Sequence, residues 1–256
     1  MLNSPPGFEQ EGSYALYLSQ VHDCSYLPGR EARNLFLDPN AKVTLNLYQQ
    51  LIDRGFRRSG CYLYQPACPH CNDCVSLRIP TARFQASRSQ RRIWKRNLPC
   101  YEVNPGPAEY RDEHYLLYQQ YLTERHPDGA MVCNSPGQYT QFLTCDWAET
   151  HFIEFRKAGK LAAVAVTDLL PEGTSSVYTF FDPQLARESL GIFALLWQID
   201  YSRRLGLKWV YPGFWIERCD KMSYKSRFRP FEAWNGQQWI DHSRLKQGGN
   251  GMNERI

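Results

Sequence analysis

The chain contains 256 residues with a mass of 29.9 kDa, a length that suits one large domain or two small ones. Hydrophobic residues make up 43% and the mean hydropathy is −0.55, so the composition excludes a disordered chain and a membrane-spanning helix. The N-terminus lacks the basic and apolar regions of a signal peptide. We therefore expect the nine cysteines to be reduced thiols or metal ligands in the cytoplasm.

The net charge of +4 is small, but the charges are unevenly distributed along the chain. Residues 74–101 include seven basic side chains and no acidic one, whereas residues 102–128 include six acidic side chains and two arginines. A turn is expected at Asn104-Pro-Gly-Pro107, where the sign of the charge changes. We therefore predict a boundary here, with an N-terminal domain over residues 1–103 and a C-terminal domain over residues 104–256.

The first half is expected to begin with an irregular segment. Asp38-Pro39 has the form of an N-cap followed by the first residue of a helix, and Gly55 marks the end of that helix. A turn-rich segment with several cysteines is predicted over residues 60–74, followed by a strand over residues 75–79. A second helix is predicted over residues 87–97, with the serine as its N-cap.

The second half has the pattern of a mixed sheet. Three strands are predicted over His151–Arg156, Leu161–Val166 and Val177–Phe181, and the short turns between them imply an antiparallel meander. A helix that is apolar on nearly every side begins at Ser189, and another strand follows over Lys208–Tyr211. This strand–helix–strand order makes the last two strands parallel.

A hairpin is predicted at Asn235-Gly236, near the end of the chain. The elements of the second half follow the order of the acetyltransferase-like (GNAT) fold, in which a mixed sheet opens around a central parallel pair. We therefore predict an α/β (α+β) protein, with a GNAT-like C-terminal domain and a smaller Cys- and Arg-rich N-terminal domain packed on it. Coenzyme A is not expected, because Leu190 and Ile192 stand where its phosphate-binding turn needs small residues and only Gly191 remains.

Four basic side chains lie on one face of the predicted 87–97 helix. They are Arg88, Arg91, Arg92 and Lys95, which recur at helical spacing. Such a stripe binds the phosphates of a nucleic acid or is an ordinary solvated face. Because the surrounding segment contains no acidic residue, we predict that the stripe contacts nucleic acid.

Cys68, Cys71 and Cys74 are spaced so that a turn can direct three thiols at one metal ion. The candidates for a fourth ligand are Cys24, Cys61, His22 and His70. The alternative is a turn that carries reduced thiols. A structural metal or an iron–sulfur cluster therefore stays open, and no other cofactor is expected.

Several separate motifs, spread over roughly residues 14–240, resemble those of the arginyl-tRNA–protein transferases. They are Cys24-Ser-Tyr-Leu-Pro-Gly-Arg30, Gly55-Phe-Arg-Arg-Ser-Gly60, Cys68-x-x-Cys71 with Leu77-Arg78, Tyr178-Thr-Phe-Phe-Asp-Pro183, Ser189-Leu-Gly191 and Trp215-Ile-x-x-Cys-x-Lys-Met-x-Tyr-Lys225. The bacterial, leucine-transferring branch is the most similar, because Leu27 stands where the eukaryotic arginyl enzymes carry a second cysteine. The same departure disfavours carrying over the iron–sulfur cluster proposed for those enzymes.

The resemblance implies an aminoacyltransferase that moves an amino acid from aminoacyl-tRNA to the α-amine of proteins beginning with Asp or Glu. In the bacterial branch the donor is leucyl-tRNA, and the product is marked for degradation under the N-end rule. We expect a cytoplasmic monomer that does not bind a membrane. The rival hypotheses are a non-enzymatic nucleic-acid-binding protein with a metal knuckle and a GNAT acetyltransferase.

Recognition of an acidic acceptor calls for arginine, whose guanidinium group matches a carboxylate with two parallel hydrogen bonds. The candidates within the family motifs are Arg30, Arg57, Arg58 and Arg78, with Cys24 as a further residue of the acceptor pocket. The alternative for each arginine is a surface ion pair or a contact with the end of a helix.

The reaction needs little chemical assistance, since the donor is an activated ester and positioning supplies most of the acceleration. The catalytic candidates are Asp182, which would orient the amine, and Tyr178, Tyr224 and Lys225, which would hold the terminal adenosine or stabilise the oxyanion. Asp182-Pro183 is equally well explained as a helix start or turn, and Tyr178 as a core residue.

Overall fold

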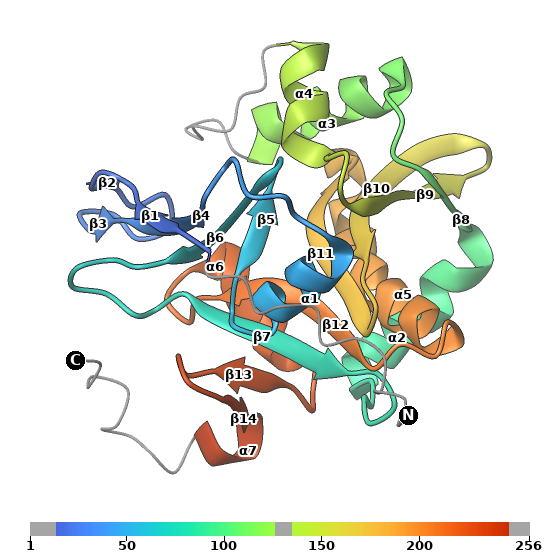
Figure 1. The fold of residues 1–256 in the computed structure, drawn as a ribbon. Helices are drawn as coiled ribbons and strands as arrows, with labels where there is room; N and C mark the ends of the chain where they lie inside the picture. Colours follow the sequence, from blue (N-terminus) through green and yellow to red (C-terminus); the bar gives the residue numbers. More distant parts are fainter. Residues whose placement is uncertain (1–13, 126–134, 246–256) are drawn as a thin grey trace, which may run out of the picture.

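The computed structural model describes residues 14–125 and 135–245, which form a large and a small β-sheet with helices packed on them (Figure 1). The large sheet has the strand order β14-β13-β7-β12-β11-β10-β9-β8, and the small sheet has the order β1-β4-β6-β5. The strands of the large sheet are β7 (Val75–Pro80), β8 (Glu102–Pro107), β9 (Glu149–Lys157), β10 (Lys160–Leu169), β11 (Gly173–Phe181), β12 (Trp209–Trp215), β13 (Glu232–Trp234) and β14 (Trp239–Asp241).

The small sheet lies in the N-terminal part of the chain and is accompanied by a short ribbon, β2 (His22–Asp23) with β3 (Glu31–Ala32). Its strands are β1 (Leu16–Leu18), β4 (Asn34–Leu37), β5 (Arg57–Ser59) and β6 (Tyr62–Pro66). The helices are α1 (Leu45–Ile52), α2 (Arg88–Asn97), α3 (Asp112–Arg125), α4 (Pro136–Leu143), α5 (Leu190–Arg204), α6 (Asp220–Ser223) and α7 (His242–Leu245), with 3-10 turns η1 (Leu98–Cys100), η2 (Pro183–Glu188) and η3 (Tyr224–Arg227).

The large sheet confirms the predicted mixed, GNAT-like arrangement. β9, β10 and β11 form an antiparallel meander, and α5 carries the chain across to β12, which pairs in parallel with β11. The parallel pairing joins Gly173–Ser175 to Trp209–Tyr211 and ends there, although both strands continue. The two central strands therefore open from each other beyond Ser175 and Tyr211, and we call this opening the seam.

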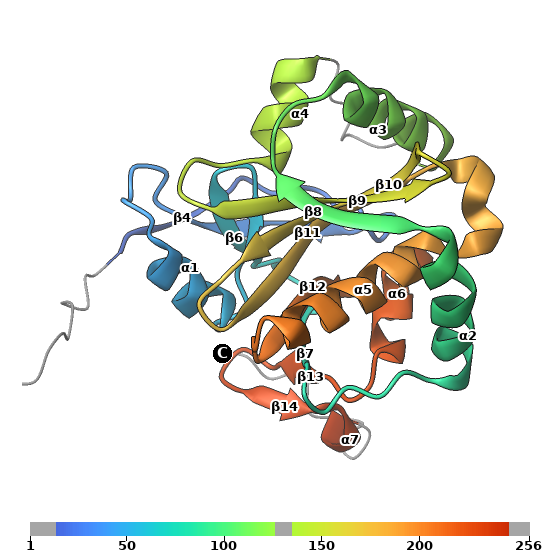
Figure 2. The same ribbon diagram turned by 90° about the vertical axis from the view of Figure 1, so that its right-hand side faces the viewer.

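Helices cover both faces of the meander (Figure 2). Alternate residues of β9 and β10 point to opposite faces, as the strand repeat requires. Phe152, Val164 and Val166 pack with α3 and α4, whereas Ile153 and Ala163 pack with α5. The predicted apolar helix is thus buried, because it lies against the sheet on one side and against α2 on another.

Three local predictions for the first half and its boundary are wrong. The first helix begins at Leu45 with Thr44 as its N-cap, because the Asp38 carboxylate instead accepts a hydrogen bond from the backbone N–H of Asn40 in a turn. Residues 104–107 belong to strand β8 rather than to a turn, since an edge strand tolerates proline. The segment expected to be irregular contains β1 to β4.

The predicted division at residue 103 stays a prediction. Strands from both sides of it share the large sheet, because β7 lies between β13 and β12. Helix α2 also crosses over to pack on α5. In the described ranges, 14–125 and 135–245, no helix has the length and apolar character needed to span a membrane.

Candidate functional site

Several of the family-like motifs meet beyond the carboxyl end of β12. A small apolar cluster joins the segment after β2, the cysteine segment and the segment after β12; it contains Leu27, Ile216 and Cys219, with Cys24, Tyr26, Cys71, Cys74 and Met222 packed on it. A crevice of ≈ 40 Å³ opens beside this cluster. It is lined by Gly55, Gln65, Pro66, Cys68, Cys71, Asn72, Cys74, Ser76, Phe214 and Trp234, none of which is charged.

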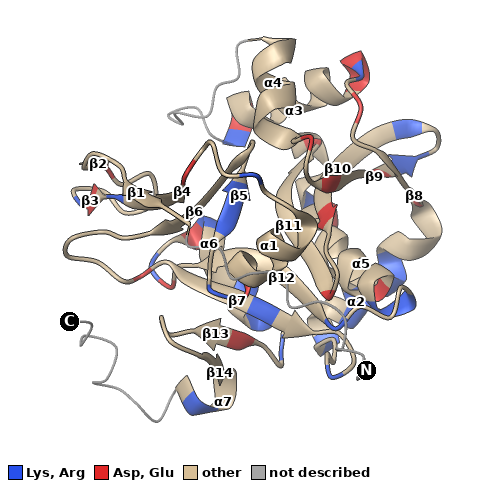
Figure 3. Cartoon of the chain, viewed as in Figure 1, with Lys and Arg blue, Asp and Glu red and all other residues tan. Residues whose placement is uncertain are grey.

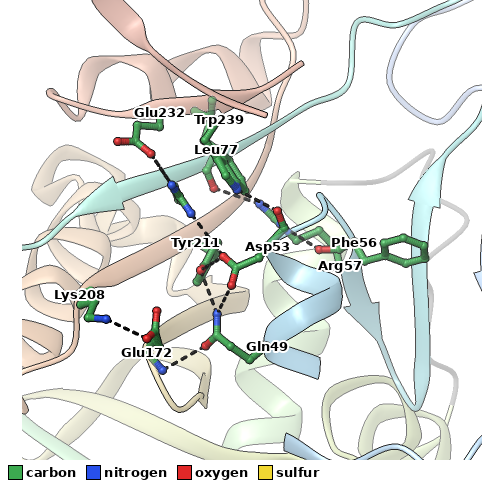
Figure 4. Close-up of polar contacts among 11 residues, drawn as sticks. Gln49, Asp53, Phe56, Arg57, Leu77, Glu172, Lys208, Tyr211, Glu232 and Trp239 are labelled. Carbon is green, nitrogen blue, oxygen red and sulfur yellow. Dashed lines mark hydrogen bonds and ion pairs between the residues drawn. The ribbon is translucent and has the colours of Figure 1, made fainter. Parts of the chain in front are cut away.

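Arg57 lies buried on β5 (Figure 4), where it packs on a residue of this crevice without lining the crevice itself. Its Nη1 donates to the Phe56 carbonyl at 2.6 Å and its Nη2 to the Leu77 carbonyl at 3.0 Å, whereas its buried Nε has no partner. The guanidinium carbon lies 5.7 Å from the ring centre of Phe214, which lines the crevice. Burial lowers the pKa of Arg57 to about 10, so the group remains charged at neutral pH.

Lys225 is the second buried cation of this region and is only 8% exposed. Its Nζ donates to the Phe214 carbonyl at 2.9 Å and contacts the Met222 sulfur at 3.3 Å. Gly213 leaves room for this amine, because its φ is +88° and an added Cβ would lie 3.3 Å from Nζ. Burial, followed by the neighbouring charge of Arg57, lowers the pKa of Lys225 to about 7.

Arg57, together with Lys225 when that amine is protonated, creates a positive site without an internal counter-ion. Within the described part of the chain, neither Arg57 nor Lys225 forms a salt bridge. Asp53 acts on Arg57 from a distance, but its carboxylate is already bound by Tyr211 at 2.6 Å and Gln49 at 2.9 Å. Because an unpaired buried charge is costly, the crevice beside these groups suits an anion.

Aromatic side chains lie around the seam. Tyr178 is half-buried on β11, 5.4 Å from the Phe142 ring and 6.4 Å from the Tyr121 ring. Tyr224 precedes Lys225, and burial raises its pKa to about 12, with Tyr121 as the second contribution. Tyr178 thus fits the alternative of a packed aromatic residue.

Asp182 directly follows β11 and is the N-cap of η2. Its Oδ1 accepts a hydrogen bond from the Gln184 backbone N–H at 2.9 Å. This contact fits the alternative given above for Asp182-Pro183, the start of a helix or a turn. A role for Asp182 in orienting an amine stays a prediction.

Two of the candidate arginines are engaged by internal acids. Arg58 forms a fully buried pair with Asp168, whose two oxygens both lie 2.7 Å from guanidinium nitrogens. Arg78 binds Glu232 at 2.7 Å and is stacked on Trp209, 3.8 Å from the ring centre. Their donors already bind carboxylates of the chain, so the geometry opposes a role for either in reading an acceptor.

Cys24 and Arg30 lie at the ends of the β2–β3 turn, where the Cys24 N–H donates to the Arg30 carbonyl at 2.8 Å. Both are half-buried, and the Cys24 sulfur accepts from the Leu27 N–H at 3.4 Å. Cys24 belongs to the apolar cluster beside the crevice. These two residues therefore stay candidates for the acceptor pocket.

The sequence left a metal site at Cys68, Cys71 and Cys74 open, and the arrangement of these residues does not favour it. All three line the crevice, yet residues 14–125 and 135–245 contain no group of three His, Cys, Asp or Glu side chains arranged to hold a metal ion. Burial raises the pKa of Cys74 to about 12, and the neighbouring Cys68 thiol adds to this effect. We therefore assign no step to a metal.

Helix α2 presents the predicted basic stripe to solvent (Figure 3). The exposed side chains are those of Arg88, Arg91, Arg92 and Lys95. The helix begins with a reciprocal capping box between Ser87 and Gln90. Gln90 Nε2 also donates to the Arg227 carbonyl at 3.3 Å, which ties the stripe to the segment that carries Lys225.

Comparison with known proteins decides the family. The family model "Arginine-tRNA-protein transferase, C terminus" matches residues 113–235, and its N-terminal counterpart matches residues 22–92. A protein of Pseudomonas fluorescens (strain Pf0-1), named aspartate/glutamate leucyltransferase, is 49% identical over 224 residues, which are 88% of this chain and 95% of that protein. The chain belongs to the arginine-tRNA-protein transferase family. A relative of the same name from Alcanivorax borkumensis is 47% identical over 91% of this chain and 96% of its own.

As a member of the arginine-tRNA-protein transferase family, the chain is a transferase, and the predicted resemblance is confirmed. Among solved structures, a C-terminal DUF2156 domain from Agrobacterium fabrum has a TM-score of 0.49 and 13% identity over 78% of this chain and 64% of that one. That similarity is too low to support a functional inference. The family assignment depends on the sequence relatives alone.

The sequence did not indicate several residues of this candidate site. Ser76, Phe214 and Trp234 line the crevice, and Gly213 makes room for Lys225. The Pro212-Gly213 pair was a usable signal, because it interrupts a strand pattern where a bulge or a close approach is expected. The other three residues have no local signal, since they meet only in the fold.

Proposed function

We propose that this chain transfers leucine from leucyl-tRNA to the α-amine of proteins whose first residue is Asp or Glu. The relatives named aspartate/glutamate leucyltransferase support this function through near-half identity over almost their whole length. The structural observation that carries the proposal is the buried pair Arg57 and Lys225 beside an uncharged crevice. A carboxylate entering there would meet the charged Arg57 and a lysine whose protonated form has no internal counter-ion.

Arg57 reads the acceptor carboxylate in this proposal. Its Nε is buried without a partner and its donors form a planar fork, which matches a carboxylate better than a lysine ammonium does. Arg30 and Cys24 would complete the pocket from the β2–β3 turn. Arg58 and Arg78 would not read the acceptor carboxylate, because each is already bound to an acid of the chain.

The seam holds the aminoacylated end of the tRNA in this proposal. Tyr121, Tyr178 and Tyr224 would form its aromatic wall, on which the terminal adenosine can stack. Aminolysis of an ester requires mainly that the amine be held against the carbonyl carbon. Such positioning can contribute on the order of 7–11 kcal/mol.

The body of the tRNA would bind along α2. Arg88, Arg91, Arg92 and Lys95 form an exposed stripe, and Gln90 links the same helix to the Lys225 segment. A cationic ridge that leads to the reaction site suits a substrate whose charge lies in its phosphates. The leucylated product would then be degraded under the N-end rule, and we place the reaction in the cytoplasm.

The test is transfer of labelled leucine or arginine from charged tRNA to peptides that differ only in their first residue. We expect leucine on peptides beginning with Asp or Glu, little on the Asn peptide and none on the Gly peptide. Arginine transfer at an equal rate would reject the leucine donor. No label from either tRNA would reject the transferase function and favour a nucleic-acid-binding protein.

The Arg57→Lys variant tests the fork within the same assay. We expect a loss of at least about tenfold in kcat/KM for the Asp peptide with unchanged tRNA affinity, because lysine keeps the charge but not the paired donors. Arg54→Lys, an exposed change three residues earlier, is the matched control. Equal rates for Arg57→Lys and the unaltered chain would remove Arg57 from the site.

A further inference from the structure

Lys225 is a buried amine, and the positioning of substrates does not by itself explain why a lysine stands at this position. A lysine ammonium offers three donors, yet in this structure Nζ has one oxygen acceptor, the Phe214 carbonyl, and one weak acceptor, the Met222 sulfur. A side chain serving only as packing would be more stable as an apolar residue of the same size. Stability alone would therefore favour an apolar residue at this position over the lysine amine.

The surroundings of Lys225 favour a neutral amine in the absence of substrate. The ionisable groups that act on it are Arg57, from β5, which repels the ammonium form, and Cys219, ahead of α6, which has the opposite and smaller effect. The carboxylates of Glu217 and Asp220 are on exposed residues and form no ion pair with it. Burial adds to the repulsion and places the pKa of Lys225 at about 7.

Phe214 connects Lys225 with the proposed carboxylate site. Its ring faces Arg57 at 5.7 Å, its carbonyl binds Lys225 at 2.9 Å, and its side chain lines the crevice. In an acceptor that begins with Asp or Glu, only a short run of carbon atoms separates the α-amine from the side-chain carboxylate. Because Phe214 contacts both side chains, a carboxylate at Arg57 and an α-amine at Lys225 can belong to one acceptor.

We propose that Lys225 is the base that removes a proton from the acceptor's α-ammonium group, and that the acceptor's own carboxylate stabilises the resulting lysine ammonium. This assignment rests on the proposed leucyl transfer. It gives the acidic first residue a second role, because the residue that is recognised also supplies the counter-ion for the base. A neutral first residue would lack both effects.

The step balances in protons and bonds. The α-ammonium loses one proton to the neutral Lys225 amine, and the nitrogen lone pair then forms a bond to the carbonyl carbon of the leucyl ester. The bond from that carbon to the ribose oxygen breaks, and the oxygen leaves as a hydroxyl after taking the second proton of the attacking nitrogen. Lys225 returns its proton to water when the product leaves.

The test compares Lys225→Met and Lys225→Arg with the unaltered chain by measuring leucine transfer to the Asp peptide from about pH 6 to about pH 9. In both variants the α-ammonium group must lose its proton to the solvent before it can react, and its pKa is about 7.7–8.0. We therefore expect the rising limb of the pH–rate profile to move up by about one pH unit, with a loss of about tenfold near pH 7 that disappears near pH 9. Lys160→Met, an exposed change on β10, is the control and should keep the original profile.

The two variants separate proton transfer from simple charge. Arginine keeps the cation but does not titrate in this range, so a role in carboxylate binding alone predicts that Lys225→Arg keeps the original profile. That result would overturn the assignment, and so would unchanged profiles in both variants. Absence of leucine transfer by the unaltered chain would overturn the proposed function, and this assignment with it.

Discussion

Arg57 and Arg58 are adjacent in the sequence, and both are buried, yet their guanidinium groups have opposite environments. Neighbouring residues of a strand point to opposite faces, so Arg57 packs on Phe214, which lines the crevice, whereas Arg58 reaches Asp168 of the large sheet. Arg58 forms an ion pair with Asp168, so the charge of its guanidinium group is balanced. The Asp168 carboxylate also accepts hydrogen bonds from Tyr48 and Thr150. Arg57 meets only carbonyls and rings.

The Arg58–Asp168 pair should dominate stability at the scale of single residues. Arg58→Met leaves the Asp168 carboxylate buried without its cation, and Asp168→Asn leaves the guanidinium group buried without its anion. We expect each change to lower the free energy of unfolding by about 3–5 kcal/mol, as measured by urea denaturation. The double variant Arg58→Met with Asp168→Leu should lose much less than the sum, and additive losses would contradict a coupled pair.

Helix α2 combines two functions at the scale of one element. Its buried face packs Trp94 against α5, and its capping box with Gln90 fixes where it begins. The opposite face carries the basic stripe, so charge changes there do not touch the core. The stripe can therefore be tested without loss of the fold.

Reversing charge at Arg91 and Arg92 to glutamate should weaken tRNA binding and make it less dependent on salt. Removing one cation that binds a phosphate reduces the slope of log affinity against log salt by about 0.7–0.9. The measurement is a set of binding titrations at increasing salt. Glutamate at Arg54 and Lys160, exposed residues outside α2, matches the change in net charge, and an equal effect there would reject a local contact.

At the scale of the whole molecule, the proposed site depends on the packing of the two sheets against each other. Arg57 comes from the small sheet, Phe214 from the large sheet and Lys225 from the segment that follows it. Strand β7 contributes to both the large sheet and the site. It pairs with β12, and its Ser76 lines the crevice. Unfolding of either sheet would therefore expose both cations.

The buried Lys225 should make the stability of the whole molecule depend on pH. Its pKa falls from 10.5 to about 7 on folding, so between these values the unfolded chain binds one more proton and stability rises with pH. Relative to that of Lys225→Met, the free energy of unfolding of the unaltered chain should rise by up to about 1.4 kcal/mol per pH unit above pH 7. Urea denaturation below about pH 8.5, before cysteines ionise in the unfolded chain, measures this difference. A constant difference would show that Lys225 is not buried as a neutral amine.

Local sequence patterns were sufficient to predict many of the elements and the family. The helix capped by Ser87, the meander and the crossover through α5 follow from capping, periodicity and short turns, which involve residues close together in the chain. The motifs also indicated an aminoacyltransferase. They placed Arg57 and Arg58 together among the candidates for the acceptor carboxylate, without distinguishing one from the other, and Lys225 among the catalytic candidates.

The neighbours of each candidate residue depend on the folded arrangement of the chain. Arg58 and its partner Asp168 are 110 positions apart, and no spacing rule connects them. The same holds for Arg57 and Lys225, whose charge states depend on burial between two sheets, and for β7, which enters a sheet formed mainly by the second half. The physical reason is that local patterns report backbone preference, whereas desolvation and ion pairing depend on neighbours brought together by folding.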